Sequence, residues 1–253
     1  MFERSQGTRA ADAKRLFVFP HAGSGIIANP FRTWGPALIE TCDVWLARLP
    51  GRAGSTERAP LAELIAYAAR LAREIAALGE RRYALFGNSM GALVAFEVAR
   101  ALHEYGAPSP DCVFVAAMPA PHLKPRCGAI HELADDAFVR ALSASMPDLA
   151  ILLESPALLR RIVPLVRSEF AAVAAYMHRS SFRLECPVIA LSGARDPWAT
   201  REDVEAWASY TRGSFRFCSV DGDHHFVRSH EGEVLPLIRE ALDAEWRIAC
   251  AAG

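Results

Sequence analysis

The strongest chemical signal in the chain is the segment 87–91, which reads GNSMG. It follows a β-favouring run, Tyr83–Phe86, and precedes a helical pattern at 92–98. A G-x-S-x-G turn between a strand and a helix holds its serine in a strained conformation with the hydroxyl lifted clear. Ser89 is therefore predicted to be a nucleophile. The alternative is a glycine-rich connection with a structural serine, and the flanking strand and helix argue against it.

A serine hydroxyl needs a base to remove its proton, and the base needs an acid to orient it. With this turn, the acid and then the histidine are expected to follow the serine along the chain. His224 lies in a loop after the strand-like run Phe215–Val220, at the edge where sites of open parallel sheets assemble. His225 is its neighbour, but adjacent residues in an extended loop point in different directions. Only one of the two can therefore face Ser89, and we predict that this loop supplies the base as His224 or His225.

The predicted acid is Asp196, which follows a strand-like run and a glycine turn one strand before the histidine. Some sites of this kind carry the acid one strand earlier. In this chain, the earlier strand, Cys112–Ala117, is followed by no carboxylate before Glu132. Asp196 could also cap a helix ahead of Pro197, and that structural role is compatible with catalysis.

Such a nucleophile also needs two backbone N–H groups directed at the negative charge that develops on the substrate oxygen. Met90, directly after Ser89, is predicted to supply one. The second is predicted to come from Ala22, in the glycine-rich loop at residues 19–25, which we name the oxyanion loop. His21 precedes the nucleophile in the chain, and we expect it to brace this loop through hydrogen bonds and to lie near the substrate.

Strands and helices in alternation are needed to bring these residues together. The β-favouring runs are 16–19, 44–49, 83–86, 112–117, 187–191 and 215–220. They are continuous rather than alternating, which is typical of strands buried on both faces of a parallel sheet. Between them lie helical patterns, of which the clearest is an apolar stripe from Leu61 to Leu78. The chain is therefore predicted to form an α/β fold with helices on both faces of the sheet.

One stretch, about 119–183, shows no convincing strand and carries helical patterns at 135–143 and 156–177. It is too long for a plain loop. We predict a helical lid inserted over the end of the sheet. Ordinary helices on the flank of the sheet are the alternative.

Composition limits the class of protein. With 253 residues, 52% hydrophobic and 23% charged, the chain is expected to form a single domain over residues 1–253. A net charge of −1 gives no reason to expect nucleic acid or an anionic membrane as a partner. The six cysteines have no CxxC spacing, so we expect free thiols and no metal site. The N-terminus lacks a secretory apolar stretch and no window suggests a membrane span, which predicts a cytoplasmic location.

Several motifs together resemble those of type II thioesterases, α/β-hydrolases that accompany polyketide and nonribosomal peptide synthetases. The motifs are FPHAG at 19–23, LPGR at 49–52, GNSMG at 87–91, SGARDP at 192–197 and GDH at 222–224. The resemblance extends from about residue 16 to residue 242, and its GDH motif implies that the base is His224 rather than His225. It implies an α/β-hydrolase fold, with a mostly parallel central sheet, flanking helices and a helical lid. It also implies editing hydrolysis of acyl groups from the phosphopantetheine arm of an acyl or peptidyl carrier protein.

By this resemblance the enzyme needs no metal or bound cofactor, because the substrate carries the phosphopantetheine. The lid is then expected to be mobile and to form the acyl chamber, with Met146 and Leu149 among the residues that contact the substrate. Basic residues near the lid are candidates for contact with an acidic carrier protein, although for most of them we expect a solvated charged face. These residues are Lys124, Arg126, Arg160, Arg161, Arg167, Arg179 and Arg183.

Two positions depart from the family pattern. Asn88 stands where the family usually has histidine, and His225 replaces a large apolar residue. Neither is a predicted catalytic residue, so a change in turnover or substrate preference is the expected consequence. The alternatives to a thioesterase are a general carboxylesterase, lipase or peptidase of the same fold, and an acyltransferase that excludes water. A catalytically silent docking subunit is a further alternative, against which the complete triad argues.

Overall fold

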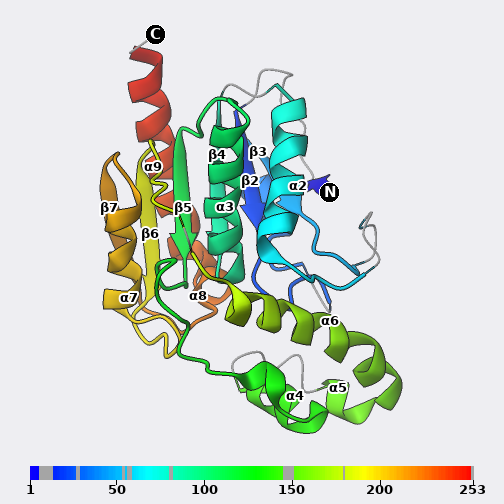
Figure 1. Cartoon of the computed structure of the whole chain (residues 1–253). Helices are drawn as coiled ribbons and strands as arrows, with labels where there is room; N and C mark the ends of the chain where they lie inside the picture. The colour runs from blue at the N-terminus through cyan, green and yellow to red at the C-terminus, as the bar shows by residue number, and fades with distance from the viewer. Residues whose placement is uncertain are drawn as a thin grey trace.

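A computed structural model describes residues 1–5, 14–26, 29–52, 55, 59–79, 82–144, 151–178 and 180–251. In this part of the chain, seven strands form one sheet in the order β1-β3-β2-β4-β5-β6-β7 (Figure 1). The strands are β1 Phe2–Arg4, β2 Arg15–Phe19, β3 Asp43–Ala47, β4 Tyr83–Asn88, β5 Cys112–Ala116, β6 Val188–Gly193 and β7 Phe215–Val220. From β3 to β7 every neighbouring pair is parallel. The prediction of an α/β fold with a mostly parallel sheet is confirmed.

The strands follow the β-favouring runs of the sequence, with two differences. β1 was not predicted, because its three residues are too few and too polar to form an apolar run. It pairs antiparallel with β3 at the edge of the sheet. β7 was predicted to be buried on both faces, but most of its residues are partly or fully exposed. Its place at the other edge of the sheet explains this exposure.

Helices cover both faces of the sheet (Figure 1). On one face, α2 Leu64–Ala77, α3 Met90–Glu104, α7 Arg201–Glu205 and the 3₁₀ turn η3 Ala206–Tyr210 enclose the larger core. On the other face, α1 Trp34–Ala37, α8 Phe226–Ser229 and α9 Glu231–Ala251 enclose the second core. α2 begins three residues later than its apolar stripe predicted. Leu61 is nevertheless 2% exposed, so it is buried ahead of the helix rather than within it.

The insertion between β5 and β6 is helical beyond the C-terminal ends of the strands (Figure 1). It contains η1 Ile130–Glu132, α4 Asp135–Ser143, α5 Ile151–Glu154 and α6 Pro156–Ala175, and no strand among its described residues. α6 begins where its sequence favours it, since the Ser155 side chain accepts a hydrogen bond from the Leu158 N–H and Pro156 occupies the first turn.

The apolar residues of the insertion form a small core of their own. Its buried members are Phe138, Val139, Leu142, Val163 and Val166. They pack α4 against α6, so much of the apolar surface that the sequence assigned to the sheet or the substrate is used within the insertion. Met146 and Leu149, the predicted acyl-contacting residues, lie outside the described residues.

Candidate active site

Ser89 lies at a strained turn between β4 and α3. Its φ is 53° and its ψ is −121°, a backbone conformation that L-residues rarely adopt. The adjoining glycines make the turn possible. A Cβ on Gly87 would meet the Gly91 carbonyl oxygen at 2.2 Å, and one on Gly91 would meet the Phe19 carbonyl oxygen at 1.9 Å. Because Gly91 has no Cβ, the end of β2, and with it the oxyanion loop, can lie against the start of α3.

The structure brings the three predicted triad residues together. His224 Nε2 lies 3.0 Å from Ser89 Oγ, and His224 Nδ1 lies 2.8 Å from Asp196 Oδ2. His224 is 5% exposed and Asp196 6%, so the contact between them is shielded from solvent, whereas Ser89 is half-buried. These distances allow the proton transfers that a serine nucleophile requires.

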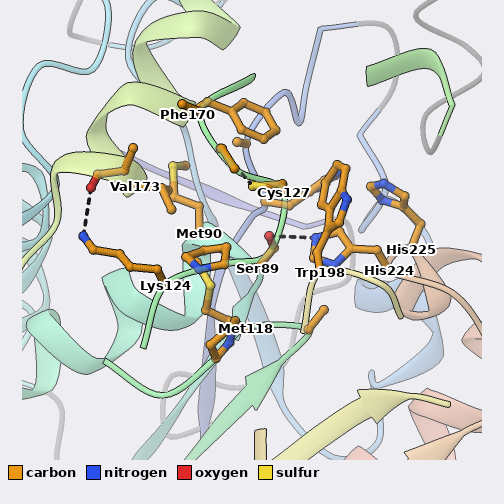
Figure 2. A pocket seen from close by; sticks show the side chains of 18 residues that line it. Ser89, Met90, Met118, Lys124, Cys127, Phe170, Val173, Trp198, His224 and His225 are labelled. Atoms are coloured by element: carbon orange, nitrogen blue, oxygen red, sulfur yellow. Dashed lines mark hydrogen bonds between the residues drawn. The ribbon is translucent and has the colours of Figure 1, made fainter. Parts of the chain in front are cut away.

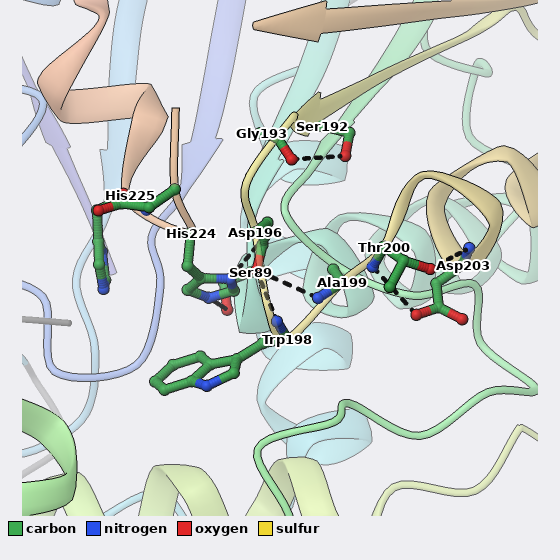
Figure 3. Close-up of polar contacts among 11 residues, drawn as sticks. Ser89, Ser192, Gly193, Asp196, Trp198, Ala199, Thr200, Asp203, His224 and His225 are labelled. Carbon is green, nitrogen blue, oxygen red and sulfur yellow. Dashed lines mark hydrogen bonds and ion pairs between the residues drawn. The ribbon is translucent and has the colours of Figure 1, made fainter. Parts of the chain in front are cut away.

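The second oxygen of Asp196 is held by backbone donors. Its Oδ1 accepts hydrogen bonds from the N–H of Trp198, at 2.8 Å, and of Ala199, at 3.2 Å (Figure 3). The carboxylate is therefore fixed in the orientation that faces His224. The Trp198 ring lies 4.6 Å from the His224 ring, measured between centroids, and covers the imidazole.

The loops that carry Asp196 and His224 are joined directly. The Ala194 N–H donates to the Val220 carbonyl at 2.8 Å, and the Arg195 N–H donates to the Gly222 carbonyl at 2.9 Å. Gly193 permits this approach, because a Cβ there would meet the Asp223 carbonyl oxygen at 2.4 Å. The relative position of acid and histidine thus follows from the pairing of β6 with β7.

The two predicted oxyanion donors, Ala22 and Met90, both lie at the cavity above Ser89. Met90 is the first residue of α3, and the N–H groups of a first helical turn have no partner within the helix. Ala22 is 6% exposed and sits in the oxyanion loop.

The His21 side chain does not brace the oxyanion loop as predicted, although the His21 backbone carbonyl accepts a hydrogen bond from the Ser24 N–H at 3.2 Å. Its Nδ1 is buried without a hydrogen-bond partner in the described part of the chain, and burial lowers its pKa well below the usual value. Glu169 on α6 contacts the loop instead, accepting a hydrogen bond from the Gly23 N–H at 2.7 Å. Sequence analysis missed Glu169. The available signal was a single carboxylate on the buried stripe of α6, whose other members are Val163, Val166, Ala172 and Val173.

A cavity of about 220 Å³ opens above Ser89 (Figure 2). Most of its lining is apolar. Its floor carries Ser89 and Met90, and α6 contributes Phe170, Val173 and Ala174. The remaining lining residues are His21, Ala22, Ala117, Met118, Pro119, Lys124, Pro125, Cys127, Gly128, Ala129, Trp198, His224 and His225. The inserted helical segment therefore forms one wall of the candidate active site.

The two departures from the family pattern are both close to this site. His225 lines the cavity, 5.3 Å from the His224 ring and 5.5 Å from the His21 ring. Burial is the main reason that its pKa falls to about 4, so it is neutral at pH 7. Asn88 is 4% exposed at the end of β4, and its Oδ1 has no hydrogen-bond partner among the described residues.

In the described ranges, no cluster of three or more His, Cys, Asp or Glu side chains is suited to hold a metal ion. The same ranges contain no helix whose length and apolar character would let it span a bilayer. Of the cysteines described as free, Cys42, Cys112 and Cys186 are buried, and Cys127 lines the cavity.

The sheet order, the helical layers and the serine turn define an α/β-hydrolase. The chain belongs to the thioesterase domain family, whose model matches residues 14–242. It is accordingly a hydrolase that acts on thioesters.

Three known proteins are similar to this chain over most of its length. The gramicidin S biosynthesis protein GrsT of Aneurinibacillus migulanus is 31% identical over 90% of this chain and 88% of that protein. Thioesterase PikA5 of Streptomyces venezuelae is 33% identical over 91% of this chain and 81% of that protein. The structure of BorB, a type II thioesterase from the borrelidin biosynthetic cluster, superimposes with a TM-score of 0.80, 31% identity and 96% coverage of both chains.

Proposed function

We propose that this chain is an editing thioesterase that removes acyl groups from the phosphopantetheine arm of acyl or peptidyl carrier proteins, in polyketide or nonribosomal peptide biosynthesis. The observation that carries the proposal is the hydrogen-bonded series Ser89–His224–Asp196 at the floor of an apolar cavity. The names of similar proteins support the pathway class. GrsT is a gramicidin S biosynthesis protein, BorB is a type II thioesterase from the borrelidin biosynthetic cluster, and YbtT, which is 27% identical, is a type II thioesterase from the yersiniabactin NRPS/PKS pathway.

In the first half of the reaction, His224 Nε2 takes the proton from Ser89 Oγ as that oxygen attacks the thioester carbonyl. Asp196 stabilises the resulting imidazolium. The N–H groups of Ala22 and Met90 face the oxyanion of the tetrahedral intermediate. When the intermediate collapses, the C–S bond breaks and the leaving thiolate takes the proton from His224. The products are acyl-Ser89 and the free pantetheine thiol.

In the second half, a water molecule gives its proton to His224 Nε2 and attacks the acyl-Ser89 ester. The second tetrahedral intermediate breaks its bond to Ser89 Oγ, which recovers the proton. A free carboxylic acid leaves. Chain, substrate and water account for every bond and proton in this sequence, so the proposal includes no cofactor.

The primary test is Ser89→Ala, assayed with an acyl carrier-protein thioester. We expect turnover to fall by a factor on the order of 10³ or more, because only binding and oxyanion stabilisation remain. Circular dichroism should be unchanged, since a side chain in a turn contributes little packing. Turnover close to that of the wild type would remove Ser89 from its proposed role.

The substrate class needs a separate experiment. The same acyl group should be offered on a carrier protein, on coenzyme A and as a simple oxygen ester. We expect the carrier-protein thioester to give the highest kcat/KM. A preference for the oxygen ester would favour a general carboxylesterase, and product formation only with an added alcohol or amine would favour an acyltransferase.

A further inference from the structure

A buried carboxylate on α6 holds the oxyanion loop at two places. Glu169 is 0% exposed, and its Oε2 accepts the Gly23 N–H at 2.7 Å. Its Oε1 accepts a hydrogen bond from Arg52 Nη2 at 2.7 Å, and Arg52 Nε donates to the Ser24 carbonyl at 2.9 Å. The loop is thus held through one N–H and one carbonyl oxygen.

This arrangement is costly as a purely structural device. Desolvation raises the pKa of Glu169 to about 7, although Arg52 and the Gly23 N–H both act to lower it. Buried ion pairs often contribute little net stability, because the cost of removing two charges from water offsets their attraction. The positions around Glu169 on the same buried stripe are filled by Val166 and Val173. An apolar residue would suit the packing here, so the charge points to a role beyond packing.

The oxyanion loop needs an external contact to adopt one conformation. Gly23 and Gly25 have φ values of 84° and 75°, and glycine adopts many other conformations at little cost. Ala22 directly precedes Gly23, so fixing the Gly23 N–H limits rotation of the peptide group that joins them. The direction of the neighbouring Ala22 N–H depends on this constraint.

We infer that Glu169 is a positioning residue that, through Gly23 and Arg52, orients the oxyanion loop for catalysis. The inference rests on the proposed function, which gives Ala22 its oxyanion role. Phe170 and Val173, on the same stretch of α6, line the cavity. One helix therefore covers the acyl group and holds the loop that stabilises its transition state.

The test separates binding of the transition state from binding of the ground state. When Ser89 Oγ adds to the carbonyl carbon of an alkyl trifluoromethyl ketone, the carbonyl oxygen becomes an oxyanion. A thioether analogue of acyl-pantetheine binds without forming such a charge. For Glu169→Gln we expect kcat and the affinity for the ketone to fall together, by about tenfold to a hundredfold. The affinity for the thioether should change less than about twofold.

Glu97→Gln is the matched control. Glu97 is also a buried carboxylate, but it accepts hydrogen bonds from Arg100 and from the Tyr176 hydroxyl, neither of which belongs to the oxyanion loop. The Glu97→Gln variant should be less stable than the wild type, but its affinity for the ketone should not fall relative to its affinity for the thioether. The inference is wrong if Glu169→Gln lowers the affinities for both ligands equally or leaves both affinities unchanged. It is also wrong if Glu97→Gln selectively lowers the affinity for the ketone.

A second variant keeps the inference testable if Glu169→Gln does not fold. Arg52→Lys retains a cation for Glu169 but loses the planar group that also reaches the Ser24 carbonyl. We expect the same selective loss for the ketone, about threefold to tenfold, and an unchanged ketone affinity would overturn the inference. An inactive wild type or an active Ser89→Ala would reject the proposed function instead. With the wild type active and Ser89→Ala inactive, a negative result at Glu169 rejects only the positioning role.

Discussion

At the residue scale, the two adjacent histidines have opposite environments. His224 uses both ring nitrogens, at 3.0 Å from Ser89 Oγ and 2.8 Å from Asp196 Oδ2, whereas His225 Nε2 has no partner in the described part of the chain. We expect His224→Ala to lower kcat/KM by a factor of at least about 10³, and His225→Ala by less than about tenfold. Steady-state kinetics on both variants check this. Reversed severities would exchange the two roles.

His225 should also affect how stability depends on pH. Its pKa falls from the ordinary 6.5 to about 4 on folding, chiefly by desolvation. The charges that act on it are those of His224, Asp223, Asp196 and Arg228. Because the folded state disfavours the protonated imidazole, stability is greatest above pH 6.5 and is lost as the pH falls toward about 4.

The variant His225→Phe removes this titration while keeping a ring in the same place. Between pH 7.5 and pH 4.5, we expect it to lose less unfolding free energy than the wild type, by about 2 kcal/mol. Urea denaturation at the two pH values measures the difference. Parallel losses in the two proteins would show that His225 titrates normally.

At the element scale, Gly193 at the end of β6 allows the loop after β7, which carries His224, to pack closely against it. In Gly193→Ala the new Cβ would press on the Asp223 carbonyl oxygen, so the loop that carries His224 must move. A displacement of a few tenths of an ångström is expected to reduce kcat by about tenfold or more. Gly232→Ala on α9 is the control, because a Cβ there meets no atom within 4 Å. Equal activity of the two variants would contradict this account of the junction.

α6 should determine which acyl groups fit, because it forms a wall of the cavity. Val173→Phe places extra volume next to Phe170, and we expect kcat/KM for an octanoyl thioester to fall at least about tenfold more than for an acetyl thioester. Ala157→Phe, exposed at the start of α6, is the matched control and should leave the ratio unchanged. A uniform loss with both substrates would mean that this wall does not select for chain length.

At the scale of the whole molecule, the basic residues near the lid divide into two groups. Lys124 donates to the carbonyls of Ala174 and Tyr176, Arg126 pairs with Asp203, and Arg167 pairs with Asp135. These three hold the chain together. Arg160 and Arg161 are exposed on α6, and Arg183 is exposed ahead of β6, so these three are better placed to meet an acidic carrier protein. Arg179 lies outside the described residues.

The double variant Arg160→Glu/Arg161→Glu should therefore weaken carrier-protein substrates more than coenzyme A thioesters. We expect KM for the carrier protein to rise about tenfold at low salt, with the difference shrinking as salt is raised. Arg73→Glu is the control, since it is exposed on the later half of α2, which runs away from the catalytic edge of the sheet. Losses that are independent of salt or equal for both substrates would count against an electrostatic contact.

The parts of this protein that follow from the sequence alone are local. The strands β2 to β7, the start of α3, α4 and the strained turn at Ser89 were predicted within a few residues, because apolar runs and glycine spacing restrict the backbone over short distances. The order of serine, acid and histidine, together with the GDH motif that separates His224 from His225, selected Ser89, Asp196 and His224, which the structure brings within hydrogen-bond distance. Parallel strands end at one edge of a sheet, so residues in the loops after them converge without further information.

Contacts between distant segments were decided only by the tertiary structure. Glu169 meets Gly23 across 146 residues of chain, and no local pattern connects a helix in the insertion with a loop after β2. The apolar residues of the insertion likewise pack mainly on one another, although their sequence fits contact with sheet or substrate equally well. Hydrophobic burial has no direction, so an apolar stripe shows that a face is buried and leaves its partner undetermined. That partner is fixed by how the helices pack once the sheet has formed.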